Sequence, residues 1–289
     1  MVTSKPESCA TCGSMDVHGW EPQCRTCGAF IDAPNVRRAM AEREILTQRY
    51  RDVRTVASRN GSADGVERLE AALTTTCAVT STIVGWARLF FEREDPLYSP
   101  YSGQVRGRTR APALPEDDAR RRAVDNALYA GYGEEMTFAA LSVDGIGLSS
   151  YGLIHLELSD GAIARRATVF EENSFTFIER LKLPTGSLVP SGHLSLWHER
   201  YMIGVIKLAS KVTDSTSRSD IVNLVLSSEG DRSTDEFIEV HIYGTFSHKA
   251  VRKVRGPSVL ADPDDHNDLV QLRRLVGAEL WENYEWKSG

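Results

Sequence analysis

Two short cysteine motifs near the start of the chain constrain its folding more than any other feature. The first reads Cys9-Ala-Thr-Cys12-Gly and the second Cys24-Arg-Thr-Cys27-Gly, with eleven residues between Cys12 and Cys24. The CxxC spacing lets both thiolates of a motif reach one metal ion, and the glycine that follows can take the positive φ of a tight turn. The pattern predicts a structural zinc site with four sulfur ligands, in a zinc ribbon that spans residues 1–32.

Redox-active cysteine pairs are the main alternative to a zinc site. A thioredoxin-type motif places one CxxC inside a strand–helix–strand unit, whereas two CxxC motifs occur here before any such unit. Four sulfur ligands leave no open coordination position, so a zinc ion would stabilise the short segment rather than catalyse a reaction. The fifth cysteine, Cys77, lies in an apolar stretch. We expect it to be a buried core thiol.

Composition and charge exclude several classes of protein. The 289 residues are 41% hydrophobic and 26% charged, unlike collagen-like, mucin-like or wholly disordered chains. The net charge of -6 indicates that the whole surface is not built to bind nucleic acid. Residues 1–10 contain no apolar segment typical of a signal peptide, and the most apolar window, residues 78–91, is too short to span a membrane. A cytoplasmic protein that does not cross a membrane is the expectation.

Residues 33–95 are predicted to form a hairpin of two long helices. Apolar residues recur at helical spacing through residues 36–59, the sequence Asn60-Gly61-Ser62 interrupts the pattern, and a second helix is predicted over residues 63–94. The first helix carries seven arginines against three acidic residues. Its polar face is therefore either simply solvated or a surface for a polyanion or an acidic partner.

Residues 96–115 have the composition of an exposed linker rich in proline and arginine. The tyrosines and arginines of this segment are compatible with nucleic-acid contact, and equally with a flexible arm.

Short runs of β-branched and aromatic residues predict an α+β domain over residues 116–289. Strands are predicted at residues 136–143, 152–158, 167–170, 221–226 and 237–243. Helices are predicted at residues 115–130, 174–183, 198–211, 247–254 and 264–281. The predicted fold class is α+β, with an N-terminal zinc ribbon, a long helical hairpin and then a mixed, mostly antiparallel sheet domain with helices.

Glu239 and His241 are the strongest candidates for catalysis. They project from the same face of the last predicted strand, about 7 Å apart along it. That spacing suits two groups that act on one substrate rather than a direct hydrogen bond between them. The alternative is a half-exposed strand whose polar residues simply face solvent.

A second polar cluster contains Tyr151, Arg166, Asn173 and Ser174. An arginine before a predicted strand, and a polar turn that leads into a helix after it, can together bind a phosphate-bearing ligand. Asn173 or Ser174 can equally be a helix cap.

These segments together resemble a known family. The order Tyr151-Gly152, Arg166-Ala-Thr168, Asn173-Ser174 and Glu239-Val-His241-Ile-Tyr-Gly244 is similar to that of the ADP-ribosyltransferase-like domains of phage head-associated proteins and bacterial polymorphic toxins. The resemblance covers about residues 135–255.

The resemblance implies that NAD is the substrate and that ADP-ribose is transferred to a protein or nucleic-acid acceptor, as in a toxin or defence effector. Glu239 would then be the late-strand glutamate, with His241 beside it, and stabilise the oxocarbenium-like state as nicotinamide leaves. The resemblance also implies that Tyr151, Arg166, Asn173 and Ser174 bind the dinucleotide. The Glu-x-Glu or Gln-x-Glu pair of arginine-modifying transferases is absent at this strand, because Glu236 and Glu239 are three residues apart, so the acceptor stays open.

Two other classes of function compete with a transferase. In one, the protein is a non-enzymatic binding module whose ribbon and arginine-rich segment 36–59 engage nucleic acid or a partner protein. In the other, His155, Glu157 and His241 form a nuclease or hydrolase site, although no motif supports it. The motifs of P-loop NTPases, Rossmann dehydrogenases and α/β-hydrolases are absent from the sequence.

Overall fold

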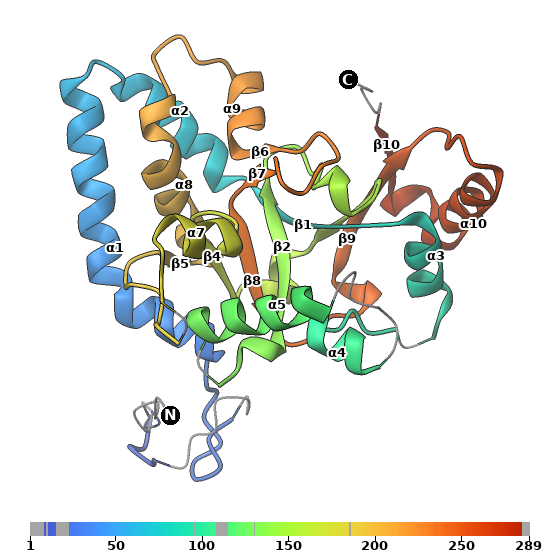
Figure 1. Ribbon diagram of the computed structural model, residues 1–289, viewed down its shortest axis with the longest axis horizontal. Coiled ribbons are helices and arrows are strands. Elements are labelled where there is room, and N and C mark those ends of the chain that lie inside the picture. Colours follow the sequence, from blue (N-terminus) through green and yellow to red (C-terminus); the bar gives the residue numbers. More distant parts are fainter. Residues whose placement is uncertain are drawn as a thin grey trace.

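An eight-stranded sheet runs through the centre of the computed structural model (Figure 1). The structure describes residues 9, 11–15, 23–94, 96–107, 115–129, 131–184 and 186–284. The strands are β1 (Cys77–Thr82), β2 (Met136–Ser142), β3 (Ile154–Leu158), β4 (Ala167–Phe170), β5 (Leu194–Leu196), β6 (Leu226–Ser227), β7 (Glu236–Phe237), β8 (Glu239–Tyr243), β9 (Val251–Pro257) and β10 (Trp281–Tyr284). The strand order is β10-β9-β3-β1-β2-β8-β4-β5, and β6 pairs separately with β7. Neighbours are antiparallel except for β9 and β10, which confirms the predicted α+β class.

Helices surround the sheet. They are α1 (Pro34–Arg59), α2 (Ala63–Thr74), α3 (Val84–Glu92), α4 (Tyr101–Arg106), α5 (Pro115–Leu128), α6 (Asp160–Ile163), α7 (Ser174–Arg180), α8 (Arg200–Leu208), α9 (Arg218–Val225) and α10 (Pro263–Leu280). Short 3-10 turns are η1 (Gly133–Glu135), η2 (Ser149–Tyr151), η3 (Trp197–Glu199), η4 (Ala209–Lys211) and η5 (His248–Ala250). Within the ranges that the structure describes, none of the helices is long and apolar enough to cross a lipid bilayer.

The central sheet forks between β1 and β2. These two strands pair over three positions, from Cys77 with Ser142 to Val79 with Ala140. Beyond Val79, β1 continues along β3, whereas the other half of β2 follows β8. Figure 1 shows β1 turning away toward α3 while β2 stays beside β8. The fork leaves two half-sheets, β10-β9-β3-β1 and β2-β8-β4-β5, whose facing edges diverge.

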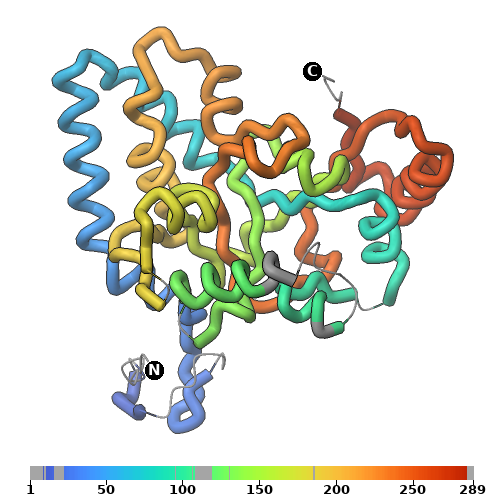
Figure 2. The backbone as a smooth tube through the Cα atoms, viewed as in Figure 1, coloured from blue at the N-terminus to red at the C-terminus, as the bar shows by residue number. Residues whose placement is uncertain are grey.

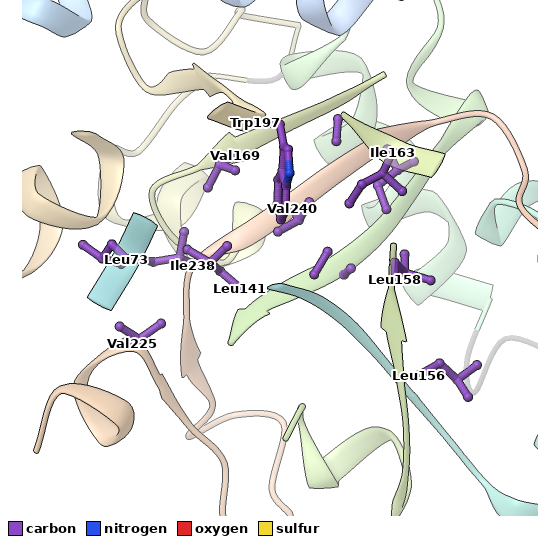
Figure 3. Packing of buried hydrophobic residues seen from close by; sticks show 14 of the residues in the cluster. Leu73, Leu141, Leu156, Leu158, Ile163, Val169, Trp197, Val225, Ile238 and Val240 are labelled. Atoms are coloured by element: carbon purple, nitrogen blue, oxygen red, sulfur yellow. The ribbon is translucent and has the colours of Figure 1, made fainter. Parts of the chain in front are cut away.

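Both faces of strand β8 are buried, and they differ in chemistry. Ile238, just before the strand, and Val240 point with Trp197 into the main hydrophobic core, which Figure 3 shows from close by. Helices α1, α2 and α8 cover this face of the half-sheet that contains β8. Glu239 and His241 lie on the opposite face and are 4% and 0% exposed. The predicted alternation is confirmed, and the alternative of a half-exposed strand is wrong.

The predicted second helix over residues 63–94 is wrong in its middle. The segment forms helix α2, then strand β1, then helix α3. Ala78 and Val79 are buried between β2 and β3, because β1 is a central strand of the sheet. A central strand buried on both faces reads as a continuous apolar run, which periodicity does not separate from a buried helix. Residues 77–82 therefore share one sheet with the domain predicted over residues 116–289.

Two further secondary-structure predictions are wrong. Residues 221–225, predicted as a strand, belong to α9, which starts with a capping box between Ser217 and Asp220. Residues 251–254, predicted as helix, belong to strand β9, which pairs with β3 and β10. The turn Asn60-Gly61-Ser62 between α1 and α2 is confirmed. The predicted linker contains helix α4, and its residues 108–114 lie outside the described residues.

Most arginines of helix α1 form ion pairs with carboxylates of the same chain. Four of its seven arginines contact carboxylates of this chain, and three of those four carboxylates lie outside α1. The pairs are Arg38 with Glu42, Arg43 with Glu199, Arg49 with Glu171, and Arg54 with Glu70. Much of the positive charge predicted for this helix is therefore neutralised locally and not offered to a polyanion.

Candidate functional site

The four N-terminal cysteines come together in one cluster. Their sulfur atoms all lie within 4.8 Å of one another. Cys9 and Cys24 open two turns of the same geometry, in which the amide of Gly13 or Gly28 donates to the cysteine carbonyl at 2.8 Å. Both glycines have a φ of 71°, as the sequence predicted. The predicted ligand set Cys9, Cys12, Cys24 and Cys27 is therefore positioned to hold a metal ion.

The cysteine segment lies apart from the sheet. Figures 1 and 2 place it outside the packed helices and strands, beside the start of α1. Cys77, by contrast, is buried in the sheet, where its thiol lies 3.5 Å from the Ser142 carbonyl oxygen. Burial raises the pKa of the Cys77 thiol to about 12. Its predicted role as a core thiol is confirmed.

A cavity of about 760 Å³ lies at the fork of the sheet. The diverging edges of β1, from Val79 to Ser81, and of β2, from Thr137 to Ala140, form part of its wall. Residues around α4, α5, α7 and η2, in the loop between β6 and β7, and on β7 and β8 complete the wall. The charged residues that line it are Arg120, Arg121, Glu179, Arg232 and Glu239.

Glu239 is the buried carboxylate of this cavity. Its Oε2 atom accepts a hydrogen bond from the backbone amide of Ser174 at 3.1 Å and lies 3.0 Å from His241 Nε2. The prediction that Glu239 and His241 would not bond directly is therefore wrong. Side chains two residues apart on one strand face can lean toward each other when a third group, here the first turn of α7, fixes the carboxylate.

His241 belongs to a chain of buried polar contacts behind Glu239. An ionised carboxylate only accepts hydrogen bonds, so His241 Nε2 carries the proton and Nδ1 accepts from the Tyr129 hydroxyl. Tyr129 also lies 3.5 Å from the hydroxyl of Thr168, which accepts from Asn35 Nδ2 at 3.1 Å. Asn35 sits in the first turn of α1. The chain of contacts therefore links the start of α1 to the cavity.

Burial and hydrogen bonding set the charge of this pair. Burial lowers the pKa of His241 below its ordinary value, although the Glu239 carboxylate opposes this shift. Burial alone would raise the pKa of Glu239, but the hydrogen bond from His241 and nearby positive charge, including Arg121, outweigh it and lower that pKa. Glu239 is therefore ionised and His241 neutral near pH 7.

Arg121 brings positive charge close to Glu239. Its guanidinium carbon lies 3.7 Å from the centre of the Phe138 ring, and its Nε lies 2.9 Å from Asp125 Oδ1. Burial raises the pKa of Asp125 to about 6, against the opposing charge of Arg121. Asp125 is thus a weaker counter-ion for Arg121 at mildly acidic pH.

The other predicted ligand-binding residues divide into two groups. Tyr151 and Asn173 line the cavity with Glu239, and the Arg232 guanidinium carbon lies 4.4 Å from the centre of the Tyr151 ring. Asn173 also caps α7 by accepting from the Phe175 amide at 2.9 Å, which confirms the capping alternative.

Ser174 and Arg166 are not among the described residues that line the cavity. Ser174 contributes its backbone amide to Glu239, while its own side chain is fully buried. Arg166 donates to the carbonyl oxygens of Tyr243 and Thr245 and stabilises the end of β8. Burial lowers the pKa of this guanidinium. Of the predicted ligand-binding residues, Tyr151 and Asn173 would therefore contact a ligand in the cavity. Arg166 stabilises the fold instead.

His155, Glu157 and His241, the residues of the nuclease or hydrolase alternative, do not form one site. Arg252 and Arg255 both bind the Glu157 carboxylate, which is 2% exposed. His155 contacts Ser81 and Tyr284 instead of Glu157. Sequence reasoning did not single out Tyr129, Asn35, Arg121 or Ser81. Their roles arise from contacts between distant segments, and no local motif marks them.

Comparison with known proteins leaves the family open. No protein-family model matches the sequence, and no curated protein matches it either.

Proposed function

We propose that the cavity at the fork binds NAD and that the protein transfers ADP-ribose from it to a protein or nucleic-acid acceptor. The observation that carries this proposal is that Tyr151, Asn173 and Glu239, three residues that the family resemblance assigns to NAD, line one cavity. They come from separate parts of the chain, so their meeting is not a consequence of closeness in sequence. The cavity volume of about 760 Å³ is typical of small-molecule and cofactor sites.

The proposed reaction breaks one bond and forms one. The bond between ribose C1′ and the nicotinamide nitrogen breaks, and nicotinamide leaves with the bonding electron pair. A nucleophile of the acceptor then attacks C1′ and loses a proton to solvent. Positive charge develops on the ribose in between, and the ionised Glu239 carboxylate stabilises it. Because Glu239 is already oriented by Ser174 and His241, little reorganisation is needed as that charge develops.

The arginines of the cavity suit the pyrophosphate of NAD. Arg120, Arg121 and Arg232 line the same cavity as Glu239. Guanidinium groups form strong charge-assisted hydrogen bonds to phosphate oxygens. Arg120 also contacts Glu179, so binding of a phosphate would compete with that exposed ion pair. Exposed ion pairs contribute little to stability, so the competition is weak.

We further propose that the cysteine cluster holds a zinc ion with a structural role. Soft thiolate ligands in a four-sulfur set select zinc over hard cations such as magnesium. Such a site has no open position for a substrate. Its proposed contribution is to fold the N-terminal segment, in which Cys9 and Cys24 are the only buried residues among those described in residues 9–33.

The transferase proposal is tested with NAD labelled on the nicotinamide and, separately, on the adenylate. The purified full chain is incubated with each label, alone and with cell extract. We expect nicotinamide release and, with extract, transfer of the adenylate label to an acceptor. Glu239→Gln should reduce both by about two orders of magnitude or more, because the neutral amide does not stabilise developing positive charge.

The matched control is Glu236→Gln. Glu236 lies on β7 close to the same strand, but its carboxylate is exposed and pairs with Lys211 at 3.0 Å. It should leave the rates unchanged. Absence of nicotinamide release from the wild type, or equal rates for Glu239→Gln and wild type, would contradict the proposal. Binding of nucleic acid or a partner protein without turnover would instead favour the binding-module alternative.

A further inference from the structure

The half-sheet that does not contain Glu239 contributes to the cavity wall a serine that is hydrogen-bonded to a buried histidine. Ser81 on β1 lines the cavity, and its Oγ lies 2.9 Å from His155 Nδ1 on β3. His155 is 0% exposed, whereas Ser81 is partly exposed. Gly147 passes over this pair so closely that a Cβ there would lie 2.4 Å from Ser81 Oγ. The serine is therefore held firmly on one side and is open on the other.

The bonding partners of His155 fix the direction of each hydrogen bond. The Tyr284 hydroxyl lies 3.0 Å from the Leu153 carbonyl oxygen and donates to it, because a carbonyl only accepts. The Tyr284 oxygen is then free to accept from His155 Nε2, 3.1 Å away. A neutral imidazole with its proton on Nε2 must accept at Nδ1. Ser81 therefore donates its hydroxyl proton to His155 and presents only lone pairs to the cavity.

The surroundings of His155 oppose a role as a general base. Burial, with a further contribution from the charge of Arg255, lowers the pKa of His155 to about 3. Arg255 in turn is held by Glu157. An imidazolium formed by proton transfer from Ser81 would be a second buried cation beside that arginine. The geometry is that of a fixed acceptor and not of an activated serine nucleophile.

Ser81 and Glu239 belong to the same face of the sheet. Val79 pairs with Ala140, and Ala140 pairs with Glu239, so these three side chains share one face. Ser81 is two residues beyond Val79 and shares that face. Glu239 and Ser81 thus lie on the two separate half-sheets that enclose the cavity. One ligand can contact both walls.

We propose that Ser81, oriented by His155 and Tyr284, is a hydrogen-bond acceptor subsite for an uncharged N–H or O–H donor of the dinucleotide. The carboxamide of nicotinamide, the ribose hydroxyls and the amino group of adenine are the uncharged donors of NAD. The inference rests on the proposed function, because it takes the ligand of the cavity to be NAD.

The first test measures the affinity of the full chain for nicotinamide and for ADP-ribose by calorimetry. Ser81→Ala should weaken the binding of one of them about fivefold to tenfold, as expected for one hydrogen bond. Weaker nicotinamide binding assigns Ser81 to the carboxamide, and weaker ADP-ribose binding assigns it to a ribose hydroxyl or the adenine amino group. Ser195→Ala, which removes a buried hydroxyl from β5 of the same sheet, is the matched control and should change neither affinity.

The second test changes the direction of the hydrogen bond without touching the cavity. Tyr284→Phe removes the acceptor for His155 Nε2, which allows the proton to move to Nδ1 and turns Ser81 into a donor toward the cavity. This variant should lose affinity for the donor ligand as Ser81→Ala does. If the first test assigns Ser81 to the carboxamide, Tyr284→Phe should also gain affinity for nicotinic acid, whose carboxylate only accepts, and an unchanged preference between nicotinamide and nicotinic acid would overturn the inference. If the first test assigns Ser81 to the ADP-ribose part, an unchanged affinity of Tyr284→Phe for ADP-ribose would overturn it.

The outcomes separate this subsite from the transferase proposal. Nitrogen-15 NMR of His155 in the ligand-free protein should show the proton on Nε2, and a proton on Nδ1 overturns the inference whatever the enzymatic result. Ser81-dependent binding of either fragment without nicotinamide release supports the subsite and contradicts the transferase. Nicotinamide release combined with fragment binding that does not depend on Ser81 or Tyr284 supports the transferase and contradicts the subsite. A wild type that binds neither fragment overturns the subsite as well.

Discussion

His241 Nε2 lies 3.0 Å from Glu239 Oε2, and both side chains are buried on the same face of strand β8, two residues apart. The Ser174 amide bonds the same oxygen atom from the start of α7. Both of these hydrogen bonds end on Oε2, so the other carboxylate oxygen is left to the cavity. The carboxylate is thereby held ionised and in one orientation before any ligand arrives.

The hydroxyl of Tyr129 should contribute to stability through His241. Tyr129→Phe leaves Nδ1 of a fully buried imidazole without its donor. We expect the free energy of unfolding in urea to fall by about 1–3 kcal/mol, which is the cost of an unsatisfied buried polar group. Tyr201→Phe on α8, outside this chain of contacts, is the control. A loss below about 0.5 kcal/mol, which is typical of surface substitutions, would contradict the role given to Tyr129.

The buried histidines should make stability depend on pH in the acidic range. The pKa of His155 is lowered to about 3, so between that pH and about 6.5 the unfolded chain binds a proton that the folded chain does not. The stabilising contribution is fully present above pH 6.5 and is lost as the pH falls toward 3. The slope for this one histidine is about 1.4 kcal/mol per pH unit.

Urea unfolding of His155→Gln between pH 4.5 and 7 measures this slope. The variant should depend less steeply on pH than the wild type by about that amount. His198→Gln is the control, because His198 is exposed and its replacement should leave the slope unchanged. Equal slopes for wild type and His155→Gln would mean that His155 is not kept neutral by the fold.

The cysteine cluster predicts a defined metal content. Mass spectrometry of the purified chain should find about one zinc ion per molecule, as for one four-sulfur site. Cys24→Ser should abolish stoichiometric binding, because three thiolates hold zinc less well than four. Cys77→Ser is the matched control and should keep the zinc, since Cys77 is buried in the sheet. Zinc retained by Cys24→Ser and lost by Cys77→Ser would reverse the assignment.

The loop over Ser81 should tolerate no side chain at position 147. A Cβ at Gly147 would lie 2.4 Å from Ser81 Oγ and 2.9 Å from Val79 Cγ1, so Gly147→Ala forces the strand or the loop to shift. We expect a loss of about 1–3 kcal/mol in the free energy of unfolding. Gly161→Ala in α6 is the control, because its nearest neighbour would be 3.7 Å away. Similar stability of the two variants would show that the loop yields without cost.

Local patterns allowed the prediction of some features and not of others. The CxxCG turns follow from a few consecutive residues, and their positive-φ glycines lie where the motif requires them. Strand β1 was predicted as helix because the hydrophobic periodicity of a segment buried on both faces does not distinguish a strand from a helix. Its position between β2 and β3 depends on the whole sheet. The alternation of β8 predicted the shared face of Glu239 and His241. It could not predict their contact, which depends on Ser174.

Sequence patterns could not predict the residues that contact Glu239 and His241 from distant segments of the chain. Asn35 approaches Thr168 and the His241 carbonyl from the first turn of α1, at a separation of 206 residues from His241. Tyr129 reaches His241 from the end of α5. Single polar residues of this kind occur throughout any sequence. They become part of the site through tertiary packing, and no spacing rule marks them in advance.

The fork of the sheet also bears on how such a site can change during evolution. The shape of the cavity follows from the point where β1 leaves β2, which is fixed by the three pairs from Cys77–Ser142 to Val79–Ala140. The side chains at its wall, such as Ser81 and Phe138, lie beyond those pairs. We therefore expect substitutions at these wall residues to change which ligand the cavity binds while its position at the fork stays the same.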